Sequence, residues 1–183
     1  MDDETTSGTG QPVSLTQMLA AREQRAARQQ AALARHALPV VSLSVVMPGP
    51  VKSTPLTRSI RDIAVTALAA LFAAKQWPIR SFAPTGGSTG PEALYVIDCD
   101  ALALKQALAE LEDTHPLGRL WDIDVLCPER GQIGRRDLGR APRRCLICNG
   151  DAHACARSQR HPLADLQAVI EEKVDAYRRQ QPE

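Results

Sequence analysis

Hydrophobic and polar positions follow two different periods along this chain of 183 residues. Apolar residues alternate with polar ones over residues 39–47, 93–98 and 119–126, as expected of strands with one buried face. Apolar residues three and four apart mark residues 54–77 and 100–113, as expected of amphipathic helices. The pattern therefore predicts alternating strands and helices rather than an all-helical or all-β chain.

The order of these elements predicts the fold class. A weaker strand candidate at 79–83 is joined to strand 93–98 as a hairpin by the loop PTGGSTGPE. The core between residues 39 and 126 then reads β-α-β-β-α-β, the split βαβ order of a ferredoxin-like α+β fold. We expect one sheet with both helices on one face, and we expect the other face to be open.

Three further segments flank this core. Ser14 has the spacing of a capping box, with a glutamine three residues later, and begins a helix predicted over residues 14–36. Residues 1–13 are predicted to be disordered, and residues 140–179 to form a cysteine- and arginine-rich loop followed by a helix. Because 183 residues are enough for one core and few for two, residues 14–179 are expected to form a single domain.

Two aspartates in strand 119–126 give the main hypothesis on function. A period of two places Asp122 and Asp124 on the same face, opposite the apolar residues of the strand. Neighbouring carboxylates repel each other, and a bound Mg²⁺ would offset that repulsion and serve phosphoryl or nucleotidyl transfer. The alternative is a pair of surface acids that pair with arginines. His115, shortly before the strand, is a candidate general base or an ordinary loop histidine.

A second candidate site lies in the segment RRCLICNGDAHACARSQRHPLADL. Cys145, Cys148, Cys155 and His161 are ligand types that suit a tetrahedral Cys3His zinc site. Thiols that only pack against their surroundings are the alternative, and His161 could instead lie near the cap of the last helix. Five cysteines are an odd number for a disulfide framework, so free thiols or metal ligands are favoured.

Cations in and around the same segment are candidates for phosphate binding. Arg143, Arg144, Arg157 and His161 surround a predicted helix start, and arginine suits a polyphosphate because its guanidinium binds phosphate with two parallel hydrogen bonds. Lys52 precedes another predicted helix N-terminus, where free N–H groups favour anions. A solvated basic loop and ordinary turn chemistry are the respective alternatives.

The composition of the chain argues against several classes of function. The formal net charge is +1, so no overall field favours nucleic acid or a membrane surface. Aromatic residues make up 3% of the chain, which disfavours a base-stacking surface. No apolar run reaches the roughly 18 residues that a membrane span needs, and the first residues are acidic and polar. We therefore expect a cytoplasmic protein that binds neither nucleic acid nor membrane.

A family resemblance rests on the stretches PGPVK, STGPEALYVID, THPLGRLWDIDVL and PRRCLICNGDAHACARSQRHPLADL. From about Ser14 to Ile170 the chain resembles the phosphoribosyl-dephospho-CoA transferase family of citrate lyase, also called citrate lyase holo-acyl carrier protein synthase. The resemblance implies that a prosthetic group is transferred from 2'-(5''-triphosphoribosyl)-3'-dephospho-CoA to a serine of the acyl carrier (gamma) subunit of citrate lyase. Diphosphate would be released.

The resemblance identifies a reaction and does not assign residues to it. For this reaction we predict that Asp122 and Asp124 hold Mg²⁺ and that His115 or one aspartate helps to deprotonate the serine. We predict that Arg119 and Lys52 bind the triphosphate. The remaining phosphates or the ribose would be bound by Arg143, Arg144, Arg157 and His161.

Two further hypotheses concern partners. An acyl carrier protein usually has an acidic surface, so the side of the first helix with Arg22, Arg25 and Arg28 is a candidate docking surface; a solvated helix face is the alternative. The rival function from a different class is a non-catalytic, zinc-stabilised binding or assembly module. That function would explain the cysteines and leave the paired aspartates without a role.

Overall fold

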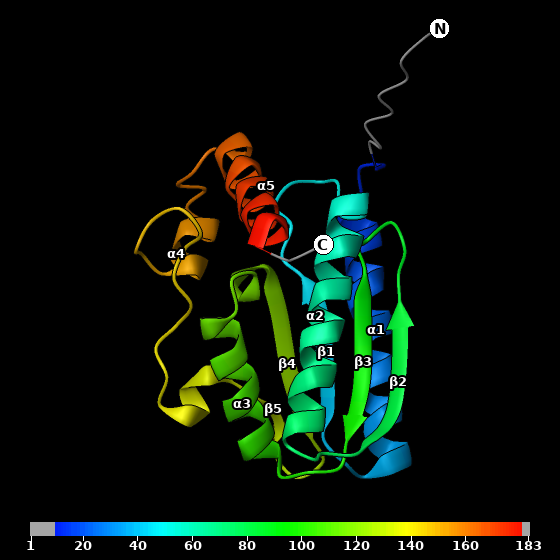
Figure 1. Ribbon diagram of the computed structural model, residues 1–183. Helices are drawn as coiled ribbons and strands as arrows, with labels where there is room; N and C mark the ends of the chain where they lie inside the picture. The colour runs from blue at the N-terminus through cyan, green and yellow to red at the C-terminus, as the bar shows by residue number, and fades with distance from the viewer. Residues whose placement is uncertain (1–9, 181–183) are drawn as a thin grey trace, which may run out of the picture.

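The computed structural model describes residues 10–180, so most of the predicted disordered tail, residues 1–13, lies outside the described residues (Figure 1). In chain order the elements are α1 (Leu15–His36), β1 (Val40–Val45), α2 (Pro55–Ala74), β2 (Ile79–Thr85), β3 (Glu92–Ile97), α3 (Ala101–Thr114), a 3₁₀ turn (Gly118–Leu120), β4 (Trp121–Cys127), β5 (Gly131–Ile133), a second 3₁₀ turn (Arg135–Leu138), α4 (Ala152–Arg157) and α5 (Leu163–Gln180).

The five strands form one antiparallel sheet in the order β2-β3-β1-β4-β5. The predicted α+β class is confirmed, and the order of β1 to β4 is consistent with the ferredoxin-like arrangement. β5, α4 and the two 3₁₀ turns were not predicted, because segments of three to six residues are too short to show a period. These short elements nonetheless build much of the candidate site.

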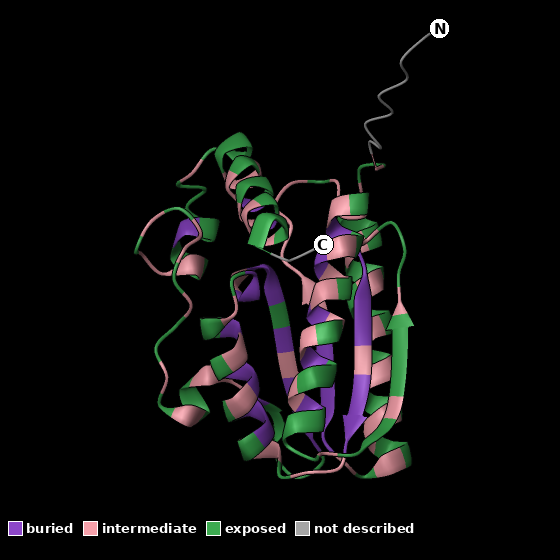
Figure 2. Ribbon diagram, viewed as in Figure 1, coloured by how far each residue is buried: buried purple, intermediate pink, exposed green. Residues whose placement is uncertain are grey.

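The main core lies between the sheet and the two helices α2 and α3, which cover one face (Figure 1). Thr54 caps α2, and Pro55 at the first helical position lacks the N–H that would have no helical partner there. Phe72 of α2 and Trp121 of β4 are among the largest fully buried side chains. Figure 2 shows the buried strands β1, β3 and β4 behind the helices and the exposed edge strand β2.

The opposite face of the sheet is partly covered, so the prediction of an open face is wrong for this region. α1 lies behind the sheet (Figure 1), and its Arg25 and Arg28 both bind the carboxylate of Glu92 in β3. Ser44 of β1 is in register with Glu92 on one side and Asp122 on the other, so α1 and the aspartates share this face. The side chain of Asp122 nevertheless remains 51% exposed.

The turn that leads into β4 depends on a close backbone contact. A Cβ added at Gly118 would overlap the backbone carbonyl of Glu112 and lie 2.8 Å from its Cα. We expect Gly118→Ala to lower the free energy of unfolding by about 1–3 kcal/mol, since overpacking forces the backbone to shift. Urea unfolding measures this, with Gly86→Ala as the control, because a Cβ at Gly86 meets no atom within 4 Å. Equal midpoints for the two variants would contradict the expectation.

Candidate functional site

β5 covers only part of the outer edge of β4, and side chains form hydrogen bonds with backbone groups of the uncovered part. β5 pairs only with the last three residues of β4. Further along this edge, the Ile123 N–H donates to Glu112 Oε1 (3.1 Å), and the Ile123 carbonyl accepts from Lys105 Nζ (2.7 Å). The Trp121 carbonyl accepts from Arg143 Nη1 (2.9 Å). Three charged side chains therefore satisfy backbone groups that would otherwise need a neighbouring strand.

Two of these charged side chains are almost completely buried and were missed by the sequence analysis. Lys105 is 3% exposed and Glu112 is 2% exposed, both on α3. Burial raises the pKa of Glu112, although Arg143 and Lys105 oppose this, and burial lowers the pKa of Lys105, although Glu112 opposes it. Their spacing could have predicted this burial. Residues 105, 109 and 112 lie three and four positions apart, next to the buried Leu104 and Leu108 of the same helix.

The two predicted aspartates lie beside this edge in different environments. Asp122 Oδ1 is 3.2 Å from Arg143 Nη1, and Asp124 Oδ1 accepts a hydrogen bond from Gln132 Nε2 (2.9 Å). Burial and the neighbouring Asp122 raise the pKa of Asp124, while Lys105 opposes the shift. Asp124 is therefore a stronger proton acceptor than an ordinary aspartate.

A cavity of about 1360 Å³ runs along the outer edge of β4. Both aspartates line it, together with the loop after β1, the second 3₁₀ turn and the segment that carries the cysteines. Its volume exceeds the roughly 300–1,000 Å³ typical of sites for drug-sized ligands. Within residues 10–180, Arg136 and Arg157 form no ion pair, so their guanidinium groups are free for an anion. The cationic and imidazole side chains along the cavity include Lys105, Arg119, Arg136, Arg143, Arg157 and His161.

The second 3₁₀ turn is held against α3 by ion pairs that the sequence did not reveal. Arg135 Nη2 lies 2.7 Å from Asp113 Oδ2, and Arg140 Nη1 lies 2.9 Å from the same oxygen. Arg135 also approaches Glu112, at 3.4 Å. This side of the cavity is therefore fixed by cations whose charges are already paired, in contrast to Arg136.

Three predicted site residues are not among those that line the cavity. Lys52 Nζ donates to a backbone carbonyl in the loop after β1, and the carbonyl of Arg144 accepts from the Arg119 guanidinium. His115 stacks on Trp121 with 4.4 Å between ring centroids, and its Nδ1 accepts from a backbone N–H. Burial lowers the pKa of His115, which favours the neutral imidazole. The structure thus brings the aspartates, Arg119, Arg143, Arg157 and His161 together, and leaves these three outside.

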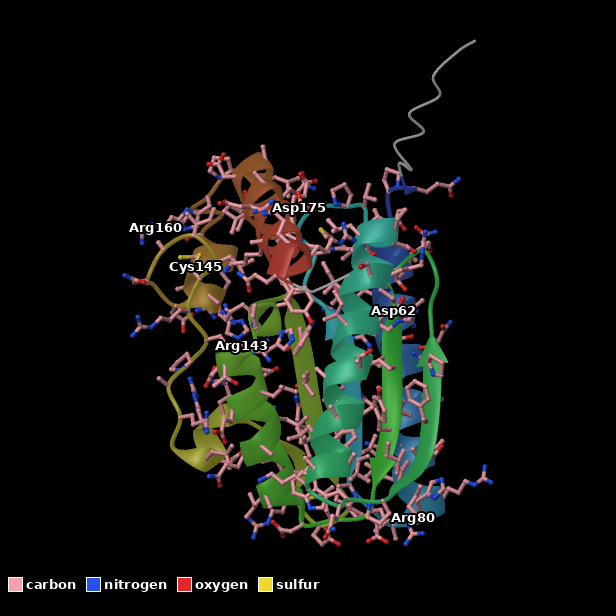
Figure 3. All side chains as sticks on the ribbon, viewed as in Figure 1. Asp62, Arg80, Arg143, Cys145, Arg160 and Asp175 are labelled. Carbon is pink, nitrogen blue, oxygen red and sulfur yellow. The ribbon has the colours of Figure 1, made fainter. Side chains whose placement is uncertain are left out.

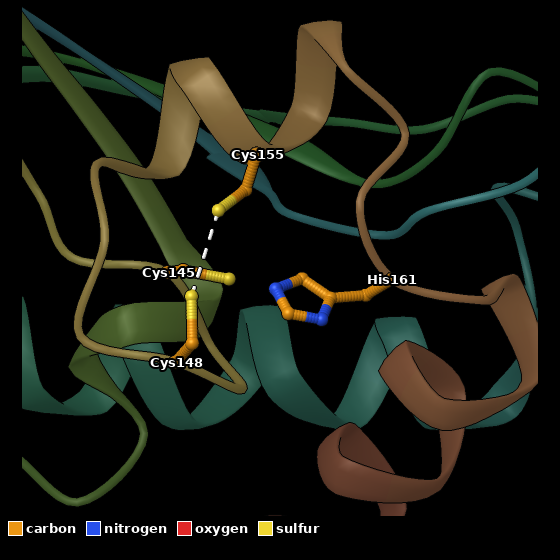
Figure 4. A group of neighbouring side chains, drawn as sticks. All are labelled: Cys145, Cys148, Cys155 and His161. Atoms are coloured by element: carbon orange, nitrogen blue, oxygen red, sulfur yellow. Dashed lines mark hydrogen bonds between the residues drawn. The ribbon is translucent and has the colours of Figure 1, made fainter.

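The predicted Cys3His group comes together as one cluster. The ligand atoms of Cys145, Cys148, Cys155 and His161 all lie within 4.8 Å of one another, and the imidazole directs one ring nitrogen toward the three sulfurs (Figure 4). The sulfurs of Cys148 and Cys155 are 3.6 Å apart, close to the about 3.8 Å that tetrahedral Zn–S bonds of about 2.3 Å produce. These four residues can hold a metal ion.

An unpartnered imidazole nitrogen supports this fit. His161 Nε2 is buried and has no hydrogen-bond partner among the described residues. A buried polar atom without a partner is costly, and coordination to a metal would remove that cost. Four protein ligands leave no open position, so the cluster has the ligand set of a structural metal site. Among the described residues it is also the one group of three or more potential ligands that the geometry brings together, and the aspartate pair belongs to no such group.

A short hairpin connects this cluster to the sheet. The Cys145 N–H donates to the Gly150 carbonyl (2.8 Å), and the Ala152 N–H donates to the Arg143 carbonyl (2.9 Å). α4, which carries Cys155, begins directly after this hairpin. Figure 3 shows Arg143 beside the end of α3 and Cys145 further along the same segment. One short segment therefore contacts the charged edge of β4 through Arg143 and begins the Cys3His cluster with Cys145.

Comparisons with known proteins show the family to which the chain belongs. None of the described helices is long and apolar enough to cross a membrane. A family model described as apo-citrate lyase phosphoribosyl-dephospho-CoA transferase matches residues 13–177. Relatives of that name from Escherichia coli O6:K15:H31 (strain 536 / UPEC) and Shigella boydii serotype 18 (strain CDC 3083-94 / BS512) are each 49% identical over 154 residues, 84% of this chain and 84% of theirs. The chain therefore belongs to the apo-citrate lyase phosphoribosyl-dephospho-CoA transferase family.

Proposed function

We propose that this chain transfers the phosphoribosyl-dephospho-CoA group to a serine of the acyl carrier subunit of apo-citrate lyase. The donor is 2'-(5''-triphosphoribosyl)-3'-dephospho-CoA. The serine oxygen forms a bond to the phosphorus next to the ribose, and the bond from that phosphorus to diphosphate breaks. The serine proton passes to a base, and diphosphate leaves with the remaining negative charge.

One observation carries this proposal: two carboxylates and several cations line the same cavity. Attack on a triphosphate needs a proton acceptor near the nucleophile and positive charge near the leaving group. The cavity lining supplies both kinds of group. Its volume of about 1360 Å³ also suits a donor much larger than a drug-sized ligand.

The geometry supports a division of roles among the cavity side chains. Asp124 accepts the serine proton, because its raised pKa makes it more basic than an ordinary aspartate. Arg136 and Arg157 bind the diphosphate end of the donor, because their charges are unpaired among the described residues and guanidinium groups bind phosphate with two hydrogen bonds. Arg143, already close to Asp122, would bind oxygens of the phosphate under attack.

Two metals enter this proposal with different roles. Asp122 would hold Mg²⁺, which would supply positive charge to stabilise the attacked phosphate, and Asp124 would stay free to accept the proton. Zn²⁺ would occupy the Cys3His cluster as a structural ion, because thiolate and imidazole are its preferred ligands. Five free cysteines are compatible with the reducing cytoplasm, where we place the reaction.

Mass spectrometry of the carrier tests the proposed function. We expect the apo carrier subunit, incubated with the purified protein, the triphosphoribosyl donor and Mg²⁺, to gain the mass of one phosphoribosyl-dephospho-CoA group. A carrier variant with alanine in place of the acceptor serine is the control and should gain nothing. An unchanged mass of the wild-type carrier would instead favour the zinc-stabilised binding or assembly module.

A further inference from the structure

Glu112 lies at the centre of the charged network under the cavity wall. Its side chain is 2% exposed and accepts hydrogen bonds from the Ile123 N–H (3.1 Å) and from the Arg143 guanidinium. Its second oxygen is 3.4 Å from Arg135 Nη1. One carboxylate thus connects α3 with the edge of β4 and with the segment that leads to the Cys3His cluster.

Arg143 is the residue through which this network reaches the aspartates. Its two terminal nitrogens reach three acceptors: Glu112, the Trp121 carbonyl and Asp122. Only 16% of its side chain is exposed, although it lines the cavity. Because Glu112 is buried and Asp122 is half exposed, the contact with Glu112 is the one that solvent competes for least.

We propose that Glu112 is a positioning residue, which fixes the Arg143 guanidinium at the cavity wall beside Asp122. The inference rests on the proposed transferase function. It gives a role in that function to a residue that does not line the cavity and so contacts neither substrate. A carboxylate suits this task because a planar guanidinium binds it in a defined orientation. Without the charge of Glu112, only the Trp121 carbonyl and Asp122 still contact Arg143, both through Nη1, so Nη2 is left to solvent and the guanidinium can turn away from its position beside the aspartate.

Glu112→Gln separates this role from a purely structural one. A glutamine oxygen can still accept from the Ile123 N–H, so the edge of β4 is kept while the charge that orients Arg143 is removed. We expect kcat to fall by about 100-fold, the cost of misplacing a reacting group by about 1 Å, while KM for the carrier stays at the wild-type value. Glu110→Gln, on the exposed side of the same helix, is the matched control and should keep wild-type kcat.

A double-mutant cycle tests whether Glu112 acts through Arg143. If it does, Arg143→Gln lowers kcat to a similar extent, and the double variant is no slower than either single variant. Effects that multiply in the double variant would overturn the proposal, as would wild-type kcat in folded Glu112→Gln. Should Glu112→Gln fail to fold, Glu112→Asp replaces it. The shorter acid keeps the charge but withdraws the carboxylate from Arg143 by one methylene group, so kcat should still fall. Wild-type kcat in that variant would equally count against the proposal.

A chemical readout keeps the test independent of the transfer reaction. Phenylglyoxal modifies accessible arginines, and peptide mass spectrometry reports the rate at each position. We expect Arg143 to react slowly in the wild type and several times faster in Glu112→Gln, with Arg136 unchanged in both. Equal rates at Arg143 would overturn the positioning role even in a protein that transfers nothing. Failure of the proposed function alone would leave the expected difference in rates intact.

Discussion

Replacing Asp124 with asparagine is expected to lower kcat for transfer to the carrier by about 10²–10⁴-fold, the usual contribution of a general base. Asparagine has nearly the same shape, and its side-chain oxygen can still accept the hydrogen bond that Gln132 donates. The loss therefore reports on the proton acceptor rather than on packing. Single-turnover labelling of the carrier, followed by mass spectrometry, measures this rate directly.

The raised pKa of Asp124 gives this prediction a pH dependence with a defined sign. The transfer rate should rise with pH as Asp124 ionises, with a midpoint above the ordinary value for aspartate. The free energy of unfolding should instead decrease over the same rise in pH. A carboxyl whose pKa is raised by folding costs stability once it ionises, so the free energy of unfolding falls as pH increases through that pKa. Asp124→Asn lacks this cost and should be at least as stable as the wild type at neutral pH.

Asp175→Asn is the matched control for Asp124→Asn, because Asp175 lies on α5 with its side chain 60% exposed. It should keep the wild-type rate. Asp122→Asn should lower kcat as well and should weaken the dependence of the rate on Mg²⁺, because Asp122 is the carboxylate proposed to hold the ion. Wild-type rates in both Asp122→Asn and Asp124→Asn would exclude the aspartates from the chemistry.

Replacing Cys155, a proposed metal ligand, is expected to have the largest effect on stability. Structural zinc supplies about 10–16 kcal/mol of apparent binding free energy in small zinc peptides, so Cys155→Ser should reduce the free energy of unfolding by about 3 kcal/mol or more. The metal content should fall from one equivalent toward zero. Elemental analysis together with thermal unfolding, with and without a chelator, measures both quantities.

Cys99→Ser provides the control for this experiment. Cys99 is a free cysteine outside the cluster, and burial raises the pKa of its thiol to about 11, so it is neither a ligand nor a reactive thiolate at neutral pH. The variant should retain one equivalent of metal. A wild-type protein that is purified without metal, and whose unfolding does not respond to a chelator, would contradict the zinc assignment.

The longer elements were predictable because their residues repeat a local period. The capping box at Ser14 and the helix predicted to begin near residue 54 are confirmed, and so is the alternation that buries Trp121 and places Asp122 on the other face. The Cys3His grouping was also visible, because its four ligands lie within 17 residues of one another in the chain. Patterns of this kind need no knowledge of the tertiary structure.

The rest of the site depends on contacts between distant segments, which no local pattern encodes. Glu112 meets Arg143 across 31 positions, and neither residue shows in the sequence that the other is its partner. α1 covers part of the second sheet face through Arg25 and Arg28, which makes these two arginines less suitable for docking a carrier than the sequence predicted. The sequence pointed to the aspartates and to Arg143, whereas the contact by which Glu112 holds Arg143 could be found only in the structure.

The charged side chains along β4 also have a consequence for self-association. An edge strand with free N–H and C=O groups is a template for pairing with another chain, and proteins commonly block such edges. At Trp121 and Ile123 the edge groups are already bonded to Arg143, Glu112 and Lys105, so no foreign strand can add there. The molecule can therefore keep a strand edge open to a large substrate without becoming prone to aggregate at that edge.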